Sequence, residues 1–103
     1  MSALDMLREG RERVARGWTQ GTYARDRDGR KAYAWAPEAC AWCALGAMRV
    51  SGHFGAEYDA ARALLERFTP AALAVSSFND ASTTTQADVL ALYDRAIAAA
   101  EAT

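Results

Sequence analysis

Apolar residues recur at three- and four-residue spacing over the first segment of the chain, with Arg and Glu between them. This period is typical of an amphipathic helix. Ser2 followed by Asp5 forms a capping box, in which each side chain accepts a hydrogen bond from the other residue's backbone N–H. Gly17 favours a left-handed stop. The pattern predicts a helix over residues 3–16.

The period changes between Trp18 and Trp35, where two runs of extended character flank Asp28-Gly29. Asp-Gly is the strongest short signal for a hairpin, because Gly takes the positive φ that a type I′ turn requires. We therefore predict one small β-hairpin over about residues 18–35. Such a hairpin is marginal alone, so its aromatic rings are expected to pack on helices.

Pro37 suits the first position of a helix, and no breaker follows before residue 51. This predicts a helix over residues 37–51. Its many small side chains suggest the most buried element of the fold. A Gly inside a helix costs about 1 kcal/mol relative to Ala, so Gly46 indicates a close approach to another segment.

The second half of the chain continues with helical periodicity. An apolar face predicts a helix over residues 56–68, and Thr69-Pro70 caps and starts a short helix over residues 70–76. The polar run at residues 76–84, which carries Asn79 and Asp80, is expected to be a loop.

Thr85 with Asp88 forms a second capping box, which opens a last helix over residues 86–101. The fold class is therefore mainly α: a compact bundle of four to five helices with one small β-hairpin. We expect a single domain over residues 1–103, because 103 residues supply one small core and exclude a large multi-part enzyme.

Composition narrows the expected compartment and partners. The first residues lack the basic start and apolar run of a signal peptide, which favours a cytoplasmic protein with reduced thiols. No apolar run approaches the roughly 18 residues that a membrane helix needs. With a net charge of -1, the basic footprint of a nucleic-acid binder is missing. A protein partner is the expectation that remains.

Basic residues concentrate near the start of the chain. Residues 1–31 carry eight Arg or Lys against five Asp or Glu, whereas residues 32–103 carry four against eight. A basic face around Arg25 and Arg27 is a candidate contact for an acidic partner, although interleaved acidic residues favour a solvated surface.

Cys40-Ala41-Trp42-Cys43 is the short motif with possible chemistry. A CxxC near a helix start lowers a thiol pKa and creates a redox pair or nucleophile. The motif lacks the strand of a βαβ unit before it, so two small core thiols are the favoured interpretation. A zinc site would need a carboxylate beside Cys40, Cys43 and His53, so no metal or other cofactor is expected.

A hydrolase arrangement is the further alternative for the thiols. Cys43 would be the nucleophile, His53 the base, and Asn79 or Asp80 the orienting group. On a helix, Cys43 and His53 would stand roughly 15 Å apart, which argues against this set.

Aromatic residues gather in the predicted hairpin and the segment after it. They form either a partner groove or, more simply, part of the core, because a small domain needs large rings to fill its interior. These residues are Trp18, Tyr23, Tyr33, Trp35 and Trp42.

Several short motifs together resemble an uncharacterised family of small bacterial and phage proteins. The family patterns are G-W-x-Q-G, W-C-x-x-G-A, [WF]-N-D and T-x-x-[DE]-V-x-x-x-[FY]-D-x-A. In this chain they fall at residues 17–21, 42–47, 78–80 and 85–96, within a similarity that covers about residues 5–98. The resemblance singles out Trp18, Gln20, Trp42, Cys43, Gly46, Asn79, Asp80, Thr85 and Asp94, whereas Cys40 and His53 match no family position.

The resemblance also implies a phage or mobile-element origin, where short proteins act by binding and blocking a host component, including defence systems. We therefore expect a non-enzymatic, partner-binding accessory or inhibitory protein. The expected partner-binding residues are Trp18, Gln20, Arg25, Arg27, Asn79 and Asp80.

Two alternatives stay open. The first is a small Cys-dependent enzyme or ligand binder that uses Cys43 with Asn79 and Asp80. The second is a structural homodimer, with the small-residue face of the helix predicted at residues 37–51 as its interface.

Overall fold

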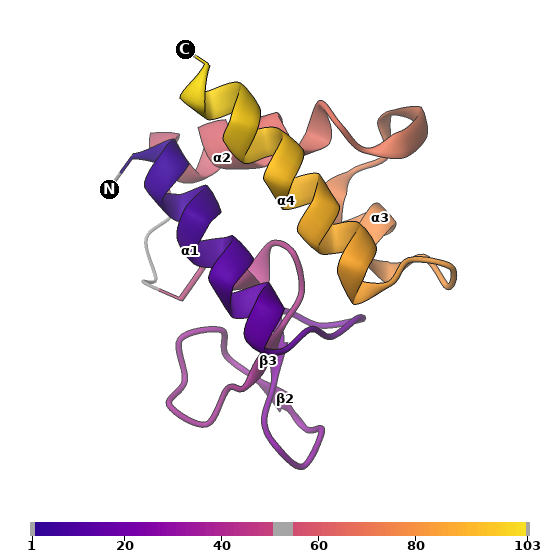
Figure 1. Ribbon diagram of the computed structural model, residues 1–103. Helices are drawn as coiled ribbons and strands as arrows, with labels where there is room; N and C mark the ends of the chain where they lie inside the picture. Colours follow the sequence, from indigo (N-terminus) through magenta and orange to yellow (C-terminus); the bar gives the residue numbers. More distant parts are fainter. Residues whose placement is uncertain (1, 51–54, 103) are drawn as a thin grey trace.

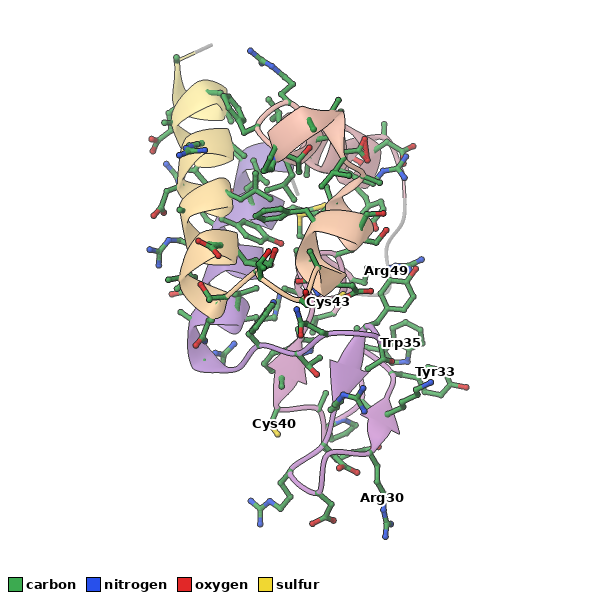
Figure 2. All side chains as sticks on the ribbon, turned by 90° about the vertical axis from the view of Figure 1, so that its right-hand side faces the viewer. Arg30, Tyr33, Trp35, Cys40, Cys43 and Arg49 are labelled. Atoms are coloured by element: carbon green, nitrogen blue, oxygen red, sulfur yellow. The ribbon has the colours of Figure 1, made fainter. Side chains whose placement is uncertain are left out.

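A helical part and a small sheet lie at opposite ends of the molecule (Figures 1 and 2). The computed structural model describes residues 2–50 and 55–102. Its radius of gyration is 12.5 Å, close to the ~13 Å of one folded unit of this length. Four α-helices and one three-stranded sheet make up the regular structure of the described residues, which confirms the mainly α prediction.

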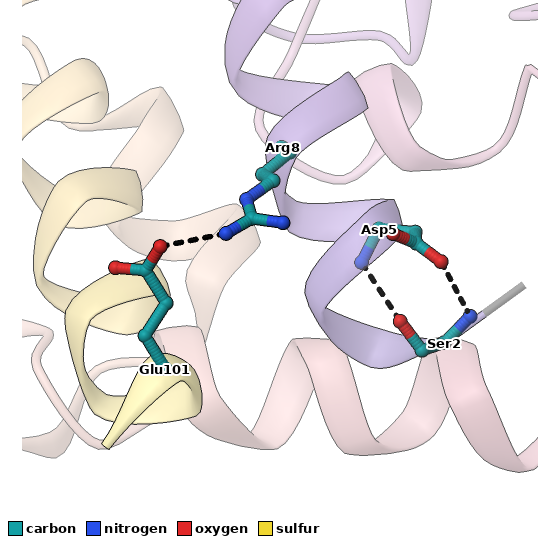
Figure 3. A network of polar contacts seen from close by, with 4 residues as sticks. All are labelled: Ser2, Asp5, Arg8 and Glu101. Atoms are coloured by element: carbon teal, nitrogen blue, oxygen red, sulfur yellow. Dashed lines mark hydrogen bonds and ion pairs between the residues drawn. The ribbon is translucent and has the colours of Figure 1, made fainter. Parts of the chain in front are cut away.

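Helices α1 (Ala3–Arg16) and α4 (Gln86–Glu101) lie side by side and antiparallel (Figure 1). Both predicted capping boxes are present. The Ser2 hydroxyl accepts from the Asp5 N–H at 3.1 Å, and the Asp5 carboxylate accepts from the Ser2 N–H at 3.2 Å (Figure 3). Thr85 and Asp88 make the same reciprocal pair. Both helices have the predicted bounds.

The contact between α1 and α4 is apolar inside and charged at its edge. Arg8 and Glu101 pair at 2.6 Å (Figure 3), and the Arg11 guanidinium contacts both oxygens of Asp94 at 2.5 and 3.3 Å. Because all four side chains are well exposed, the pairs add little stability. Stability comes from burial of the apolar faces, chiefly Leu7, Val14, Val89, Leu92, Tyr93 and Ala96.

Helix α2 (Ala56–Glu66) covers the ends of α1 and α4 and buries Tyr58, Ala61 and Leu65, as its apolar spacing predicts. The short helix predicted at residues 70–76 is wrong. A 3₁₀ turn, η2 (Pro70–Ala72), stands there instead, because Ala71 and Ala72 adopt positive φ angles of 52° and 55° and end it.

Helix α3 (Val75–Asp80) occupies part of the segment predicted as a loop, so that prediction is wrong. Val75 and Asn79, one turn apart, are both buried against the rest of the molecule. Tertiary contacts therefore hold six residues of low intrinsic helix propensity in a helix.

The predicted hairpin is present, with a different turn. Strand β1 (Ala24–Arg25) pairs antiparallel with β2 (Lys31–Ala32). Gly29 has φ 79°, but Asp28 does not have the positive φ of a type I′ turn. Asp26 instead closes a longer loop: its carboxylate accepts from the backbone N–H of Asp28 at 2.9 Å and of Arg30 at 3.0 Å.

The α-helix predicted at residues 37–51 is wrong over residues 37–50, the part of that range that the structure describes. Strand β3 (Ala41–Trp42) adds to the hairpin in the order β2-β1-β3, and a 3₁₀ turn, η1 (Gly46–Met48), follows. The backbone N–H groups of Cys40 and Cys43 donate to Arg25 O at 2.9 Å and Tyr23 O at 3.1 Å. Sheet pairing therefore overrides the helical composition of this segment.

Two glycines allow the close backbone approaches of this sheet. A Cβ on Gly46 would lie 2.0 Å from Tyr23 O, which confirms the predicted close contact at Gly46 although no helix surrounds it. A Cβ on Gly17 would lie 2.1 Å from Cys40 O. Gly17 has φ −172°, so its predicted left-handed stop is wrong. A glycine is needed there because a larger residue would collide with the backbone of Cys40.

Candidate functional site

Asn79 lies at the centre of a buried hydrogen-bond cluster that joins α3 to the hairpin. Its Oδ1 accepts from the Trp18 indole N–H at 2.8 Å and from the Ala44 backbone N–H at 2.9 Å. Its Nδ2 donates to Thr19 O at 3.1 Å and to an Asp80 carboxylate oxygen at 3.0 Å. The side chain is 1% exposed, so its full donor and acceptor capacity is spent within the chain.

Gln20 and Asp80 extend this cluster, which we call the Asn79 clasp. The Gln20 amide donates to Asn79 O at 2.9 Å and to Ala81 O at 3.0 Å. The Asp80 carboxylate accepts from the Gly21 backbone N–H at 3.0 Å. The structure thus brings Trp18, Gln20, Asn79 and Asp80 together as predicted, and gives them an intramolecular bonding role. Their contact with a partner stays a prediction.

Cys43 lies beside the Asn79 clasp. With Asn79, Asp80 and five neighbouring residues it lines a cavity of about 350 Å³. Burial raises the pKa of the Cys43 thiol, against the opposing effect of hydrogen bonds from the backbone of Gly46 and Leu45. The Gly46 N–H lies 3.2 Å from Sγ. A raised pKa lowers the thiolate fraction, so the surroundings of Cys43 do not activate it as a nucleophile.

The other residues of the proposed thiol chemistry lie elsewhere. Cys40 is exposed on the hairpin side, whereas Cys43 is buried (Figure 2), so the CxxC spacing does not form a facing pair. His53 lies outside the described residues. Within residues 2–50 and 55–102, no group of three or more His, Cys, Asp or Glu could hold a metal ion.

Arg25 and Arg27, both predicted to meet a partner, differ in their surroundings. The Arg25 guanidinium donates to Thr19 Oγ1 at 2.9 Å, to Gly29 O at 3.0 Å and to Gln20 O at 3.2 Å, so it braces the hairpin. Arg27 is exposed in the loop between β1 and β2.

The hairpin carries three large aromatic side chains that face outward. Tyr33 is 70% exposed, Trp35 50% and Tyr23 47%. The Tyr33 and Trp35 rings stack with centroids 5.1 Å apart and planes 9° from parallel (Figure 2). Of the predicted core rings, Trp42 is buried and its indole N–H donates to Ala34 O at 3.0 Å. The expectation that Tyr23, Tyr33 and Trp35 fill the core is therefore wrong.

Burial alternates from one residue to the next over residues 31–35, in strand β2 and in the turn that follows it. In a strand, successive side chains point to opposite faces, and the same alternation continues here past the end of β2. Ala34 is buried, so its neighbours Tyr33 and Trp35 project outward. The run Lys31-Ala32-Tyr33-Ala34-Trp35 places every large residue on one face and every Ala on the other. This alternation was the available sequence signal for an exposed aromatic face.

Arg49 joins this face to the helical part. Its guanidinium carbon lies 4.2 Å from the centre of the Tyr23 ring and 5.6 Å from that of Tyr58 on α2. Such cation–π contacts hold the guanidinium over the rings. We call the resulting hollow of about 700 Å³ the hairpin groove. It is lined by Thr22, Tyr23, Lys31, Ala32, Tyr33, Ala34, Trp35, Glu38 and Arg49.

Fold and groove define a small, mainly α protein with an aromatic hairpin face. The chain belongs to the family of unknown function DUF6197, whose family model matches residues 1–99. This confirms the expected membership of an uncharacterised family. No curated protein and no solved structure matches the chain. Among the described residues, none of the helices has the length and apolar character needed to cross a membrane.

Proposed function

We propose that this chain is a non-enzymatic accessory or inhibitory protein that binds a protein partner through the hairpin groove. The carrying observation is the stacked, exposed pair of Tyr33 and Trp35 beside Arg49. Tyr, Trp and Arg dominate the energetics of protein interfaces, because they bury much area and still make polar contacts. Gathering them on one exposed face leaves apolar area that a partner would cover.

The Asn79 clasp supports this proposal because it holds the hairpin, which carries the groove, against α3. Trp18, Gln20 and Asp80 tie the start of the hairpin to α3, and Arg25 braces its loop. A rigid, preorganised surface loses less conformational entropy on binding. In this proposal Arg27 meets the partner directly, whereas the clasp residues and Arg25 position the groove.

The surroundings of Cys43 favour binding over chemistry. The thiol is buried with a raised pKa, and the Asn79 amide beside it already makes four hydrogen bonds. A Cys-dependent enzyme would need a thiolate and an orienting group with capacity left for it. The interface proposed for the homodimer alternative is not present as predicted, because residues 37–50 form a strand and a 3₁₀ turn and no α-helix.

The narrower form of the proposal is a cytoplasmic inhibitor of phage or mobile-element origin that blocks a host component, such as a defence protein. It rests on the resemblance of the sequence motifs to small bacterial and phage proteins. Because the proposed partner is a component of a bacterial host, the test uses a bacterial lysate.

The test is affinity capture from that lysate with the wild-type chain and the double variant Tyr33→Ala/Trp35→Ala. We expect a protein captured by the wild type to be lost with the double variant. The matched control is Leu73→Ala, which removes another exposed apolar side chain (40% exposed) outside the groove. It should capture as the wild type does.

A partner retained equally by the double variant would refute the groove as the binding site. Sedimentation of the wild type tests the remaining alternative. Self-association that disappears in the double variant would assign the groove to a second copy of the chain instead.

A further inference from the structure

We infer that the hairpin groove takes an extended segment of the partner protein, which adds to the sheet as a further strand along β2. This inference rests on the proposed function and names the conformation and side-chain pattern of the bound segment. Three observations carry it: the register of β2, the cover on the other edge of the sheet, and the position of the exposed rings beside the open edge.

The register of the hairpin leaves backbone groups of β2 without a neighbouring strand. The Asp26 N–H donates to Arg30 O at 2.9 Å, and the next residue, Lys31, lies opposite Arg25. Hydrogen-bonded and non-hydrogen-bonded pairs alternate in an antiparallel ladder, so the N–H and C=O of Lys31 point away from β1. Neither group makes a hydrogen bond with another described residue. The edge of β2 is therefore open to another strand.

The chain itself covers the opposite edge of the sheet. Trp18 forms a parallel bridge with Trp42 of β3. The Thr19 N–H donates to Trp42 O at 3.2 Å, and the Trp42 N–H donates to Gly17 O at 3.1 Å. Proteins usually cover or block sheet edges, because unpaired edges invite pairing with other chains. In the order β2-β1-β3, the described residues leave the edge at β2 uncovered, where it borders the hairpin groove.

The polar groups of this region match a backbone and not a particular charge. Lys31 and Glu38 in the lining have opposite signs, and the Arg49 guanidinium is held over the Tyr23 ring. The edge of β2 offers a donor and an acceptor alike. An extended strand brings the same equal supply of N–H and C=O groups, whereas a helix has already paired both internally.

The exposed rings determine the side-chain pattern of the segment. Lys31, Tyr33 and Trp35 are exposed in alternation with two Ala, and the Tyr33 and Trp35 rings stack (Figure 2). Opposite residues of neighbouring strands point to the same face of a sheet, so every second side chain of the segment would reach this face. Aromatic and β-branched side chains make the most favourable cross-strand contacts with rings. The segment should therefore carry such residues at alternate positions.

A flexible segment fits this edge better than the rigid hairpin of a second copy. The loop closed by Asp26 and the turn in which Tyr33 O accepts from the Ala36 N–H limit the straight edge to residues 31–33. Two such short edges would bury far less than the roughly 1,200 Å² of a stable interface. An extended segment can pair at the edge and continue into the adjacent hollow of about 700 Å³.

The experiment begins with selection from a random-sequence peptide display library on the immobilised full chain. We expect the recovered peptides to carry aromatic or β-branched residues at every second position. The strongest peptide is then N-methylated at one residue at a time, which removes one backbone N–H. Because alternate N–H groups of a strand face the paired edge, affinity should fall at least about fivefold at every second residue.

The edge of the protein has its own pair of variants. Lys31→Pro removes the outward N–H, and an edge strand tolerates proline where the N–H faces solvent. Lys31→Ala is the matched control, because it removes the same side chain and retains the N–H. Proline should weaken binding of the selected peptide at least about fivefold more than alanine does. Amide spectra establish that both variants are folded.

Amide hydrogen exchange of the wild-type chain reports the pairing without a substitution. The Lys31 N–H should exchange more slowly when the peptide is bound, because it gains a hydrogen-bond acceptor. The Ala32 N–H is the control within the same strand. It faces β1 in the ladder and should change far less.

Recovery of no peptide, or of peptides without the alternating pattern, would overturn the inference. So would a peptide that tolerates N-methylation at every residue, equal binding to Lys31→Pro and Lys31→Ala, or unchanged exchange at Lys31. Self-association of the wild type that Lys31→Pro abolishes would also overturn it, because the edge would then belong to a second copy.

Failure of the inference can be told apart from failure of the proposed function. If a captured lysate partner needs Tyr33 and Trp35 but leaves exchange at Lys31 unchanged, the inference fails and the proposed function stands. If capture is independent of both rings, the proposed function fails, and the inference fails with it.

Discussion

Asn79, predicted to bind a partner, is also a central structural residue of the fold. An Asn-Asp pair in a polar stretch is typical of a turn or of a site, and the sequence offers no sign that both ends of the amide are used. The structure uses each of them twice, on atoms up to 61 positions away in sequence. The fold therefore gives Asn79 a structural role, and its contact with a partner stays a prediction.

Replacing Asn79 by Ala should lower the free energy of unfolding by ~3 kcal/mol, because the Trp18 indole N–H and the Ala44 N–H lose their buried acceptor. Urea unfolding followed by circular dichroism measures this loss. Ser77→Ala, exposed on the same helix, is the control and should change little. A stable Asn79→Ala variant that no longer binds a partner would contradict the clasp role.

The two thiols should differ in reactivity. Cys40 is exposed, whereas Cys43 is buried with a raised pKa, so iodoacetamide should modify Cys40 in the folded protein and Cys43 only after denaturation. Mass spectrometry at each Cys measures both rates. Fast modification of Cys43 in the folded chain would contradict its protection and favour the enzyme alternative.

At the scale of elements, the sequence predicts those helices whose ends are set by local signals. It does not predict the elements that depend on contacts with distant residues. The capping boxes of Ser2 and Thr85 act within one turn, so the bounds of α1 and α4 can be read from the sequence. Strand β3 depends on a partner strand 16 or more residues earlier, at Ala24 and Arg25. Its own residues favour a helix, so no local pattern reveals it.

The candidate site divides in the same way. The sequence motifs grouped Trp18, Gln20, Asn79 and Asp80, which do meet in space. Tyr33 and Trp35 point outward because the rest of the molecule covers the other face of the hairpin. That arrangement could not be predicted from the sequence, because residues 37–51 were expected to form a helix. Arg49 enters the groove through the same rearranged segment.

Gly46→Ala should test the pairing of this segment with β1. The new Cβ would meet Tyr23 O, a backbone atom that cannot turn away, so we expect a loss of at least ~1–3 kcal/mol in unfolding free energy. Thermal unfolding measures it. Gly29→Asn is the matched control, because nothing lies near a Cβ there and Asn tolerates its positive φ. Equal effects of both changes would contradict the close approach.

At the scale of the whole molecule, the free energy of unfolding should decrease on both sides of neutral pH, because carboxyl groups titrate at acid pH and a thiol and a phenol titrate at alkaline pH. Hydrogen bonds from Ser2 and Arg11 lower the pKa of Asp5 and Asp94, so their contribution is present at neutral pH and lost as pH falls below ~4. Burial raises the pKa of Cys43 and Tyr93, so the contribution of Cys43 is lost as pH rises above ~8.5 and that of Tyr93 as pH rises above ~10.

Chemical unfolding at a series of pH values should therefore give a plateau between these limits. Asp94→Asn should flatten the acid side, and Cys43→Ala should weaken the initial alkaline loss. An unfolding free energy that increases as the pH rises past the ordinary thiol pKa would contradict the assigned directions of the pKa shifts.

The pairing of Arg8 with Glu101 brings the two ends of the chain to the same end of the helix pair (Figures 1 and 3). A pulling force applied to both ends would therefore open α1 and α4 from that end, one turn after another, instead of sliding them past each other. Because the contacts break in succession, each step needs little force. The protein would yield easily to a motor that pulls its ends apart, whatever its resistance to heat or urea.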